Sequence, residues 1–125
     1  MKVLTIKEPF ATLIMEKKKS IETRSWKTNY RGELYIHAGL SNYKYLDSES
    51  KELIKDIKLN HGNIICKCNL VDCVYMDEEF IANIKKNHIE YLFGKYEVGR
   101  YAWILEDVVK IDKIPAKGKL SIWTK

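Results

Sequence analysis

The sequence lacks the cysteine patterns that mark disulfide-bonded and zinc-binding proteins. Its three cysteines, Cys66, Cys68 and Cys73, lie within eight positions and form no CxxC pair. An odd number at this spacing argues against both a disulfide framework and a structural zinc site. We therefore expect reduced thiols packed in or beside a strand, and no bound metal.

Long hydrophobic runs are also absent. No stretch reaches the roughly 18 consecutive apolar residues that a membrane-spanning helix needs. The sequence does not begin with a charged leader followed by an apolar run and a small-residue cleavage site. These absences favour a cytoplasmic protein that does not associate with membranes.

Familiar catalytic and cofactor-binding motifs are missing as well. The chain has no Gly-rich phosphate loop, no GxSxG elbow and no HExxH pair. A cysteine nucleophile would need a histidine partner, and the cysteine cluster has none nearby in the sequence. We expect no cofactor.

The composition that is present describes a soluble globular protein. We expect one domain over residues 1–125, long enough to bury a core without covalent staples. Hydrophobic residues make up 46% and charged residues 31%, and 22 basic against 17 acidic side chains give a formal charge of +5. This excess permits an anionic partner such as RNA or a nucleotide without requiring one.

The apolar pattern predicts an α+β, mainly β fold. We expect helices after Pro9, after Asp47 or Ser48, and after Asp77, and a core-packed connection over residues 88–93. Residues 108–111 either continue the strand before them or form its hairpin partner. About five to six strands with about three helices predict a small closed or nearly closed β-barrel. The strands are expected at residues 3–6, 21–26, 33–38, 64–76, 99–105 and 120–123.

Two polar residues lie within the expected strands. Residues 33–38 alternate so that Tyr35 and His37 face outward, which predicts that His37 lies outside the core. Asp72 breaks the apolar face of residues 64–76. Either a bulge re-phases the strand there, or Asp72 is a buried carboxylate with a specific partner.

Residues 17–26, KKKSIETRSW, concentrate charge directly after a helical pattern. In a strand, Glu22, Arg24 and Trp26 would share one face, with Lys19 at the preceding turn. Lysine and arginine can hold phosphate, glutamate can accept from a base amino group, and tryptophan can stack on a base. The alternative is a basic helix end followed by a half-buried strand with a solvated face. Further candidates for the same patch are Tyr30, Arg31 and His37.

Several segments together closely resemble the ASCH domain, a family in the PUA-like superfamily of small β-barrels with the signature GxKxxExR. The resemblance covers nearly the whole chain and implies a PUA-like barrel. Lys19, Glu22 and Arg24 match the signature, whereas Lys17 stands at the family glycine. Lys17 either continues the helix or places another cation at the rim, where a glycine would ease a left-handed turn. The resembling segments are 4–11, 19–24, 30–38, 98–105 and 114–118, together with Trp123.

The resemblance implies binding of RNA or a nucleotide in a cleft lined by the motif. Lys19 and Arg24 would contact phosphate or a base edge. Glu22 would orient Arg24 or accept from an exocyclic amine. The expected stacking residues are Trp26, Tyr30 and Tyr35, and the expected rim residues are Arg31, His37 and Arg100.

A small hydrolase is the alternative. Some small relatives are amidohydrolases of acetylated cytidine that use the motif lysine, a threonine three residues on and a separate glutamate. Here Glu22 takes the threonine position, and Thr23 should face the other side. An amidohydrolase of a modified cytidine or a ribonuclease would use Lys19 and Glu22, while a protein-interaction domain would use neither. The candidates for a second carboxylate are Asp72, Asp77, Glu78 and Glu79.

Overall fold

The computed structural model describes residues 1–125. Six strands form one sheet in the order β2-β5-β4-β3-β1-β6, in which only β1 and β3 pair in parallel. The strands are β1 (Lys2–Glu8), β2 (Ile21–Arg24), β3 (Gly32–Asn42), β4 (Asn63–Tyr75), β5 (Tyr101–Pro115) and β6 (Ile122–Thr124). The helices are α1 (Phe10–Met15), α2 (Ser48–Leu53), α3 (Glu78–Ile84) and α4 (His88–Leu92).

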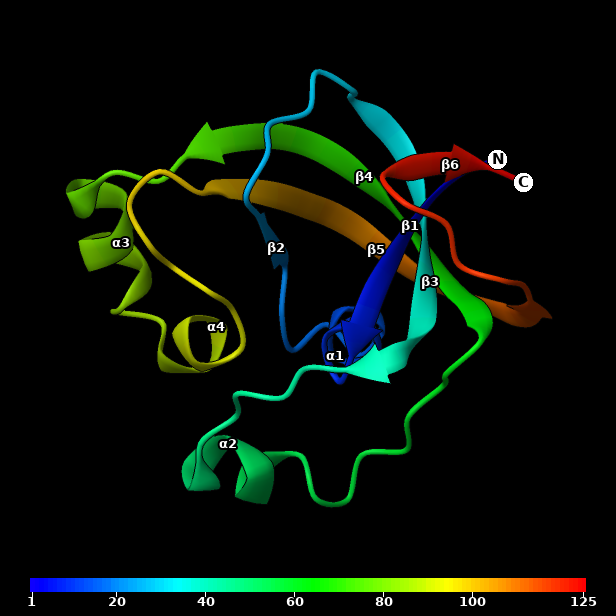
Figure 1. Ribbon diagram of the computed structural model, residues 1–125, viewed down its shortest axis with the longest axis horizontal. Helices are drawn as coiled ribbons and strands as arrows, with labels where there is room; N and C mark the ends of the chain where they lie inside the picture. Colours follow the sequence, from blue (N-terminus) through cyan, green and yellow to red (C-terminus); the bar gives the residue numbers. More distant parts are fainter.

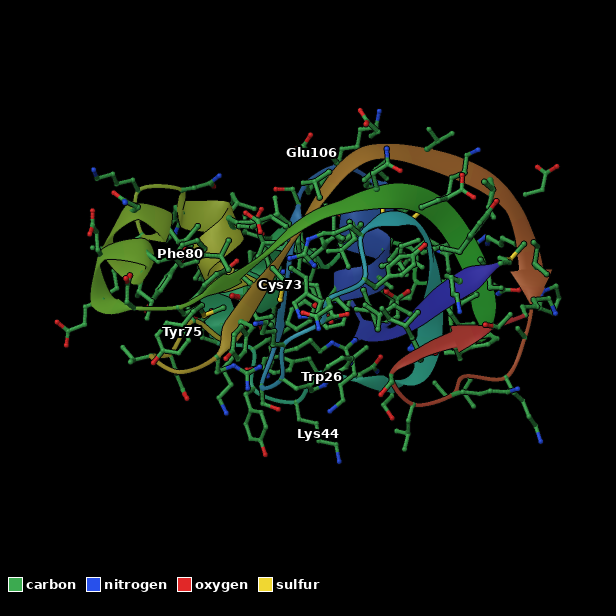
Figure 2. All side chains as sticks on the ribbon, turned by 90° about the horizontal axis from the view of Figure 1, so that it is seen from above. Trp26, Lys44, Cys73, Tyr75, Phe80 and Glu106 are labelled. Carbon is green, nitrogen blue, oxygen red and sulfur yellow. The ribbon has the colours of Figure 1, made fainter.

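The sheet curls because its two longest strands are bent. The β4–β5 ladder changes register three times, and each irregularity adds local twist and curvature. Figure 1 shows both strands arching across the molecule, and Figure 2 shows Glu106 projecting from the outer side of this arch. The edge strands β2 and β6 do not pair with each other. The predicted nearly closed, mainly β barrel is therefore confirmed.

Helix α1 lies inside the curl and contacts four of the six strands. Its residues Phe10 to Ile14 are all buried, so the helix has no solvent-facing stripe at its centre. Seventeen buried residues, all from α1 and the strands except Phe93 after α4, make the main core, with Trp103 fully buried among them. A smaller cluster around Ile21 and Met76 packs beneath α3 and the segment after α4. This arrangement places the end of α1 and the start of β2 against the core.

Several local predictions are confirmed. Asp47 and Asp77 cap α2 and α3 by accepting from the backbone N–H three residues on, each at 2.8 Å. Residues 108–111 continue the bent strand β5. At Asp72 the strand re-phases through an irregularity between Leu70 and Asp72, and the Asp72 side chain is exposed.

One local prediction is wrong, and one open alternative is decided. Residues 88–92 form a fourth helix, because Asn87 caps it through its side chain and starts a turn of helix within the connection. Helix α1 ends at Met15, and Lys17 adopts a left-handed conformation with φ of 61°. Lys17 therefore does not continue the helix, and it takes the backbone conformation that the family glycine would take more easily.

The cysteines are free thiols. Cys66 and Cys68 are buried, and burial raises the pKa of each from 9.0 to about 12. Cys73 is half-buried. None of the four helices has the length and apolarity that crossing a bilayer requires.

Candidate functional site

A cleft of about 760 Å³ lies beside β1 and β2. Figure 1 shows β2 on one side of β1 and the segment from β5 to β6 on the other. The cleft is lined by five cationic side chains and one carboxylate, that of Glu22. The cations are Lys7, Arg24, Lys95, Arg100 and Lys119. The wall is therefore strongly positive.

Arg24 is held in place from two sides. Its Nε donates to Glu22 Oε2 at 3.0 Å, and Nη2 lies 2.9 Å from the same oxygen. Nη2 also donates to the carbonyl oxygen of Thr5 at 2.8 Å, which ties β2 to β1. The Nη1 group has no protein partner. Glu22 and Arg24 are two positions apart on one strand, so their side chains share the face that the sequence predicted.

Lys19 lies beneath the cleft, because its side chain is fully buried and does not line it. Nζ donates to the carbonyl oxygen of Ile21 and lies 3.7 Å from Glu90 Oε2. The ammonium also lies 5.1 Å from the ring centroid of Phe10, which itself lines the cleft. Burial lowers the pKa of Lys19, and the carboxylates of Glu22 and Glu90 partly offset this effect.

Glu90 on α4 is a residue that sequence reasoning missed. Its Oε1 accepts from the backbone N–H of Ser20 at 2.7 Å and from the Ser20 hydroxyl at 3.0 Å. Oε2 faces Lys19 and has no hydrogen-bond partner, nor has the buried hydroxyl of Tyr96. Burial, followed by the charge of Glu90, raises the pKa of Tyr96. The only signal for Glu90 was a single carboxylate within the apolar run 89–93.

The carboxylates that the sequence offered as a second acid lie elsewhere. Asp72 is exposed and 3.7 Å from Arg31, and Asp77 caps α3. Glu78 and Glu79 are exposed in the first turn of that helix. Glu90 is thus the carboxylate that the fold brings to Lys19, together with Glu22.

The remaining predicted residues divide into two groups. Arg100 lines the cleft, where Nε donates to the carbonyl oxygen of Lys95 at 3.1 Å. Trp26 packs edge-on against Trp103, with ring centroids 4.7 Å apart, and accepts a hydrogen bond from the Trp103 indole through its carbonyl oxygen. Trp26 lies outside the cleft, as do Tyr30, Arg31 and Tyr35.

The aromatic side chains that do line the cleft were missed as well. Phe10, Tyr43 and Tyr45 form a continuous edge, with centroid separations of 4.8 Å and 5.7 Å. The two tyrosines come from the segment between β3 and α2, for which the sequence predicted no site residue. No periodic pattern marks them, because their segment is irregular.

His37 is buried, with 1% of its surface exposed, so the prediction that it lies outside the core is wrong. Nε2 lies 2.7 Å from the carbonyl oxygen of Ala116, and Nδ1 lies 3.2 Å from the Thr5 hydroxyl. Because a carbonyl only accepts, we assign the proton to Nε2, and Nδ1 then accepts from Thr5. The Trp123 indole donates to the same Thr5 oxygen at 3.0 Å. The alternation gave the correct side of β3, but the segment after β5 covers that side.

A curled sheet enclosing one helix, with a basic cleft beside its first strand, defines a mainly β domain of the PUA-like kind. The family model for the ASCH domain matches residues 4–115, and the chain belongs to this family. The resemblance found in the sequence is thereby confirmed.

Solved structures show the same fold. The chain is 18% identical to ASCH from Zymomonas mobilis, with a TM-score of 0.57 over 91% of this chain and 72% of that one. A tyrosine-to-phenylalanine variant of that protein matches equally well, over 74% of its length. Among curated proteins no match is found. At this identity the structural likeness describes the fold alone.

Proposed function

We propose that this ASCH domain binds RNA or a nucleotide-like ligand in the cleft. The observation that carries the proposal is the charge of the wall, five cations against one carboxylate. Arg24 pairs with Glu22, and Lys95 pairs with Glu97 at 4.0 Å. An incoming anion therefore meets uncompensated positive charge on the other three cations, Lys7, Arg100 and Lys119. Such a wall favours the binding of phosphate groups. The volume of the cleft, about 760 Å³, is in the range of small-ligand sites.

The fixed position of Arg24 supports a direct contact. Glu22 and the Thr5 carbonyl occupy Nε and Nη2, which leaves the Nη1 edge for a ligand. A guanidinium that is already oriented loses little side-chain entropy when it binds phosphate or a base edge. The rings of Phe10 and Tyr43 at the same cleft offer apolar faces for a base.

The test is RNA affinity measured by fluorescence anisotropy across a range of salt concentrations. We expect affinity to fall steeply with salt, and Arg24→Ala to weaken binding roughly tenfold and reduce the salt slope by about one. Arg31→Ala is the matched control, because Arg31 lies outside the cleft. Lys119→Ala provides a second cleft variant, at a side chain whose ammonium lies 5.7 Å from the centroid of the Trp123 ring. Salt-independent binding, or equal effects of Arg24→Ala and Arg31→Ala, would refute the proposal.

One observation favours hydrolysis as a second candidate. Lys19 is buried beside two carboxylates with a lowered pKa, and a lysine in that state can act as a neutral base or nucleophile. In this structure its ammonium is closed off from the cleft, so a substrate would have to displace the side chains above it.

The two candidates are separated by incubating the protein with acetylated cytidine and with RNA, beside a Lys19→Met variant. Turnover that disappears in the variant supports the hydrolase. RNA binding without turnover in the wild-type protein supports the binding function.

A further inference from the structure

The three most exposed large hydrophobic side chains of the protein all line the cleft. They are Leu120, Leu40 and Tyr45, at 93%, 83% and 82% exposure, whereas the other exposed ones range from 42% to 58%. Isolated exposed leucines are common on protein surfaces and need no explanation. Their concentration at one basic cleft does need one.

Leu40 and Leu120 come from different parts of the fold. Leu40 lies near the end of β3, and Leu120 lies between β5 and β6. Figure 1 shows that these two segments approach β1 from different directions. Both segments pack on Thr5, since a Cβ added to Gly39 would lie 3.0 Å and one added to Gly118 would lie 2.9 Å from the Thr5 methyl carbon. The two exposed leucines therefore border the cleft from neighbouring segments.

The segment between β5 and β6 that carries Leu120 is held in place by contacts with β1 and β3. His37 donates to the Ala116 carbonyl at 2.7 Å, which fixes the start of the segment. Gly118 then packs closely on Thr5, and a Cβ added to Gly118 would lie 2.9 Å from the methyl carbon of Thr5. Any side chain at position 118 would force Thr5 or the segment itself to shift. These two contacts fix the backbone that precedes Leu120.

We infer, on the basis of the proposed function, that the ligand is a stretch of RNA whose unpaired base enters the cleft while Leu40 and Leu120 contact the bases next to it. Apolar side chains can lie against base faces and separate neighbours in a stack. The adjacent cations, Lys119 and Lys7 among them, would follow the phosphates. A protein partner would meet the same positive wall, which favours nucleic acid as the occupant.

The test uses Leu40→Ser, Leu120→Ser and the double variant, with Leu53→Ser as control. Leu53 is also an exposed leucine, but it lies on α2 outside the cleft. The probes are an RNA hairpin with a fluorescent adenine analogue in its loop, and adenosine monophosphate. Wild-type protein should unstack the analogue and raise its fluorescence. The double variant should lose this rise and bind the hairpin roughly tenfold or more weakly, and its loss of affinity for the mononucleotide, which has no neighbouring bases, should be smaller.

The outcomes distinguish this inference from the proposed function. If the double variant binds the hairpin like wild type while Arg24→Ala weakens binding, the inference is overturned and the proposed function stands. An equal loss of hairpin affinity in Leu53→Ser would overturn the inference too. It would also be overturned if the wild-type protein sedimented as a dimer and Leu40→Ser and Leu120→Ser made it monomeric. Absence of any RNA or nucleotide binding would remove both.

Discussion

Replacing Glu90 by glutamine should destabilise the fold by about 2–4 kcal/mol. The change keeps an oxygen that can accept from the Ser20 backbone, so the main packing and hydrogen bonds stay. What it removes is the negative charge that faces the buried ammonium of Lys19.

The magnitude follows from the distance and the burial. Lys19 Nζ and Glu90 Oε2 lie 3.7 Å apart, with side chains 0% and 6% exposed, so water screens the pair little. At an effective dielectric constant of about 20, opposite unit charges at this distance attract by about 4 kcal/mol. The Ile21 carbonyl and Glu22 continue to stabilise the ammonium, which brings the lower bound to about 2 kcal/mol.

The assay is urea denaturation of a double-mutant cycle made from Glu90→Gln and Lys19→Met. Glu49→Gln is the control, since Glu49 pairs with the exposed His88 and should cost less than about 0.5 kcal/mol. A coupling energy below about 0.5 kcal/mol between Lys19 and Glu90 would refute the reasoning.

The same pair predicts a pH dependence. Burial lowers the pKa of Lys19 in the folded state below its ordinary 10.5. At pH values between the folded-state pKa and the unfolded-state pKa, Lys19 is protonated in the unfolded chain and deprotonated in the folded one. The free energy of unfolding therefore rises with pH in this range, by up to about 1.4 kcal/mol per pH unit. Because Glu90 is one of the groups that raise the pKa of Lys19, Glu90→Gln should shift the start of this rise to lower pH. Subtracting the curve of the corresponding Lys19→Met variant isolates the contribution of the lysine.

Three further predictions concern the fold. Lys17→Gly should raise the free energy of unfolding by about 0.5–1 kcal/mol, seen as a higher melting temperature, because it relieves a left-handed lysine. The raised pKa of Cys66 and Cys68, about 12 against 9.0 unfolded, gives stability that is fully present below pH 9.0. Above pH 9.0 the free energy of unfolding should fall by up to about 2.7 kcal/mol per pH unit. Alkylation of the folded protein should modify Cys73 first, because the other two thiols are buried. His37→Phe should cost about 1–3 kcal/mol in urea denaturation, because the part-buried hydrogen bond to the Ala116 carbonyl is lost.

The sequence by itself determined the periodic and local features. The pattern of apolar residues located the six strands, and the caps at Asp47 and Asp77 located two helices, because these signals depend on neighbours within a few residues. The signature residues Glu22 and Arg24 share one strand face for the same reason. The family resemblance also held over most of the chain.

Only the tertiary structure decided what covers each of these faces. Lys19 meets Glu90 across 71 positions of sequence, and the segment after β5 returns over His37 from 79 positions away. No local pattern encodes such meetings, because they depend on how far β4 and β5 bend and where the connections return. The curl of the sheet therefore turned one signature cation into a buried charge and left Arg24 with a free edge at the cleft.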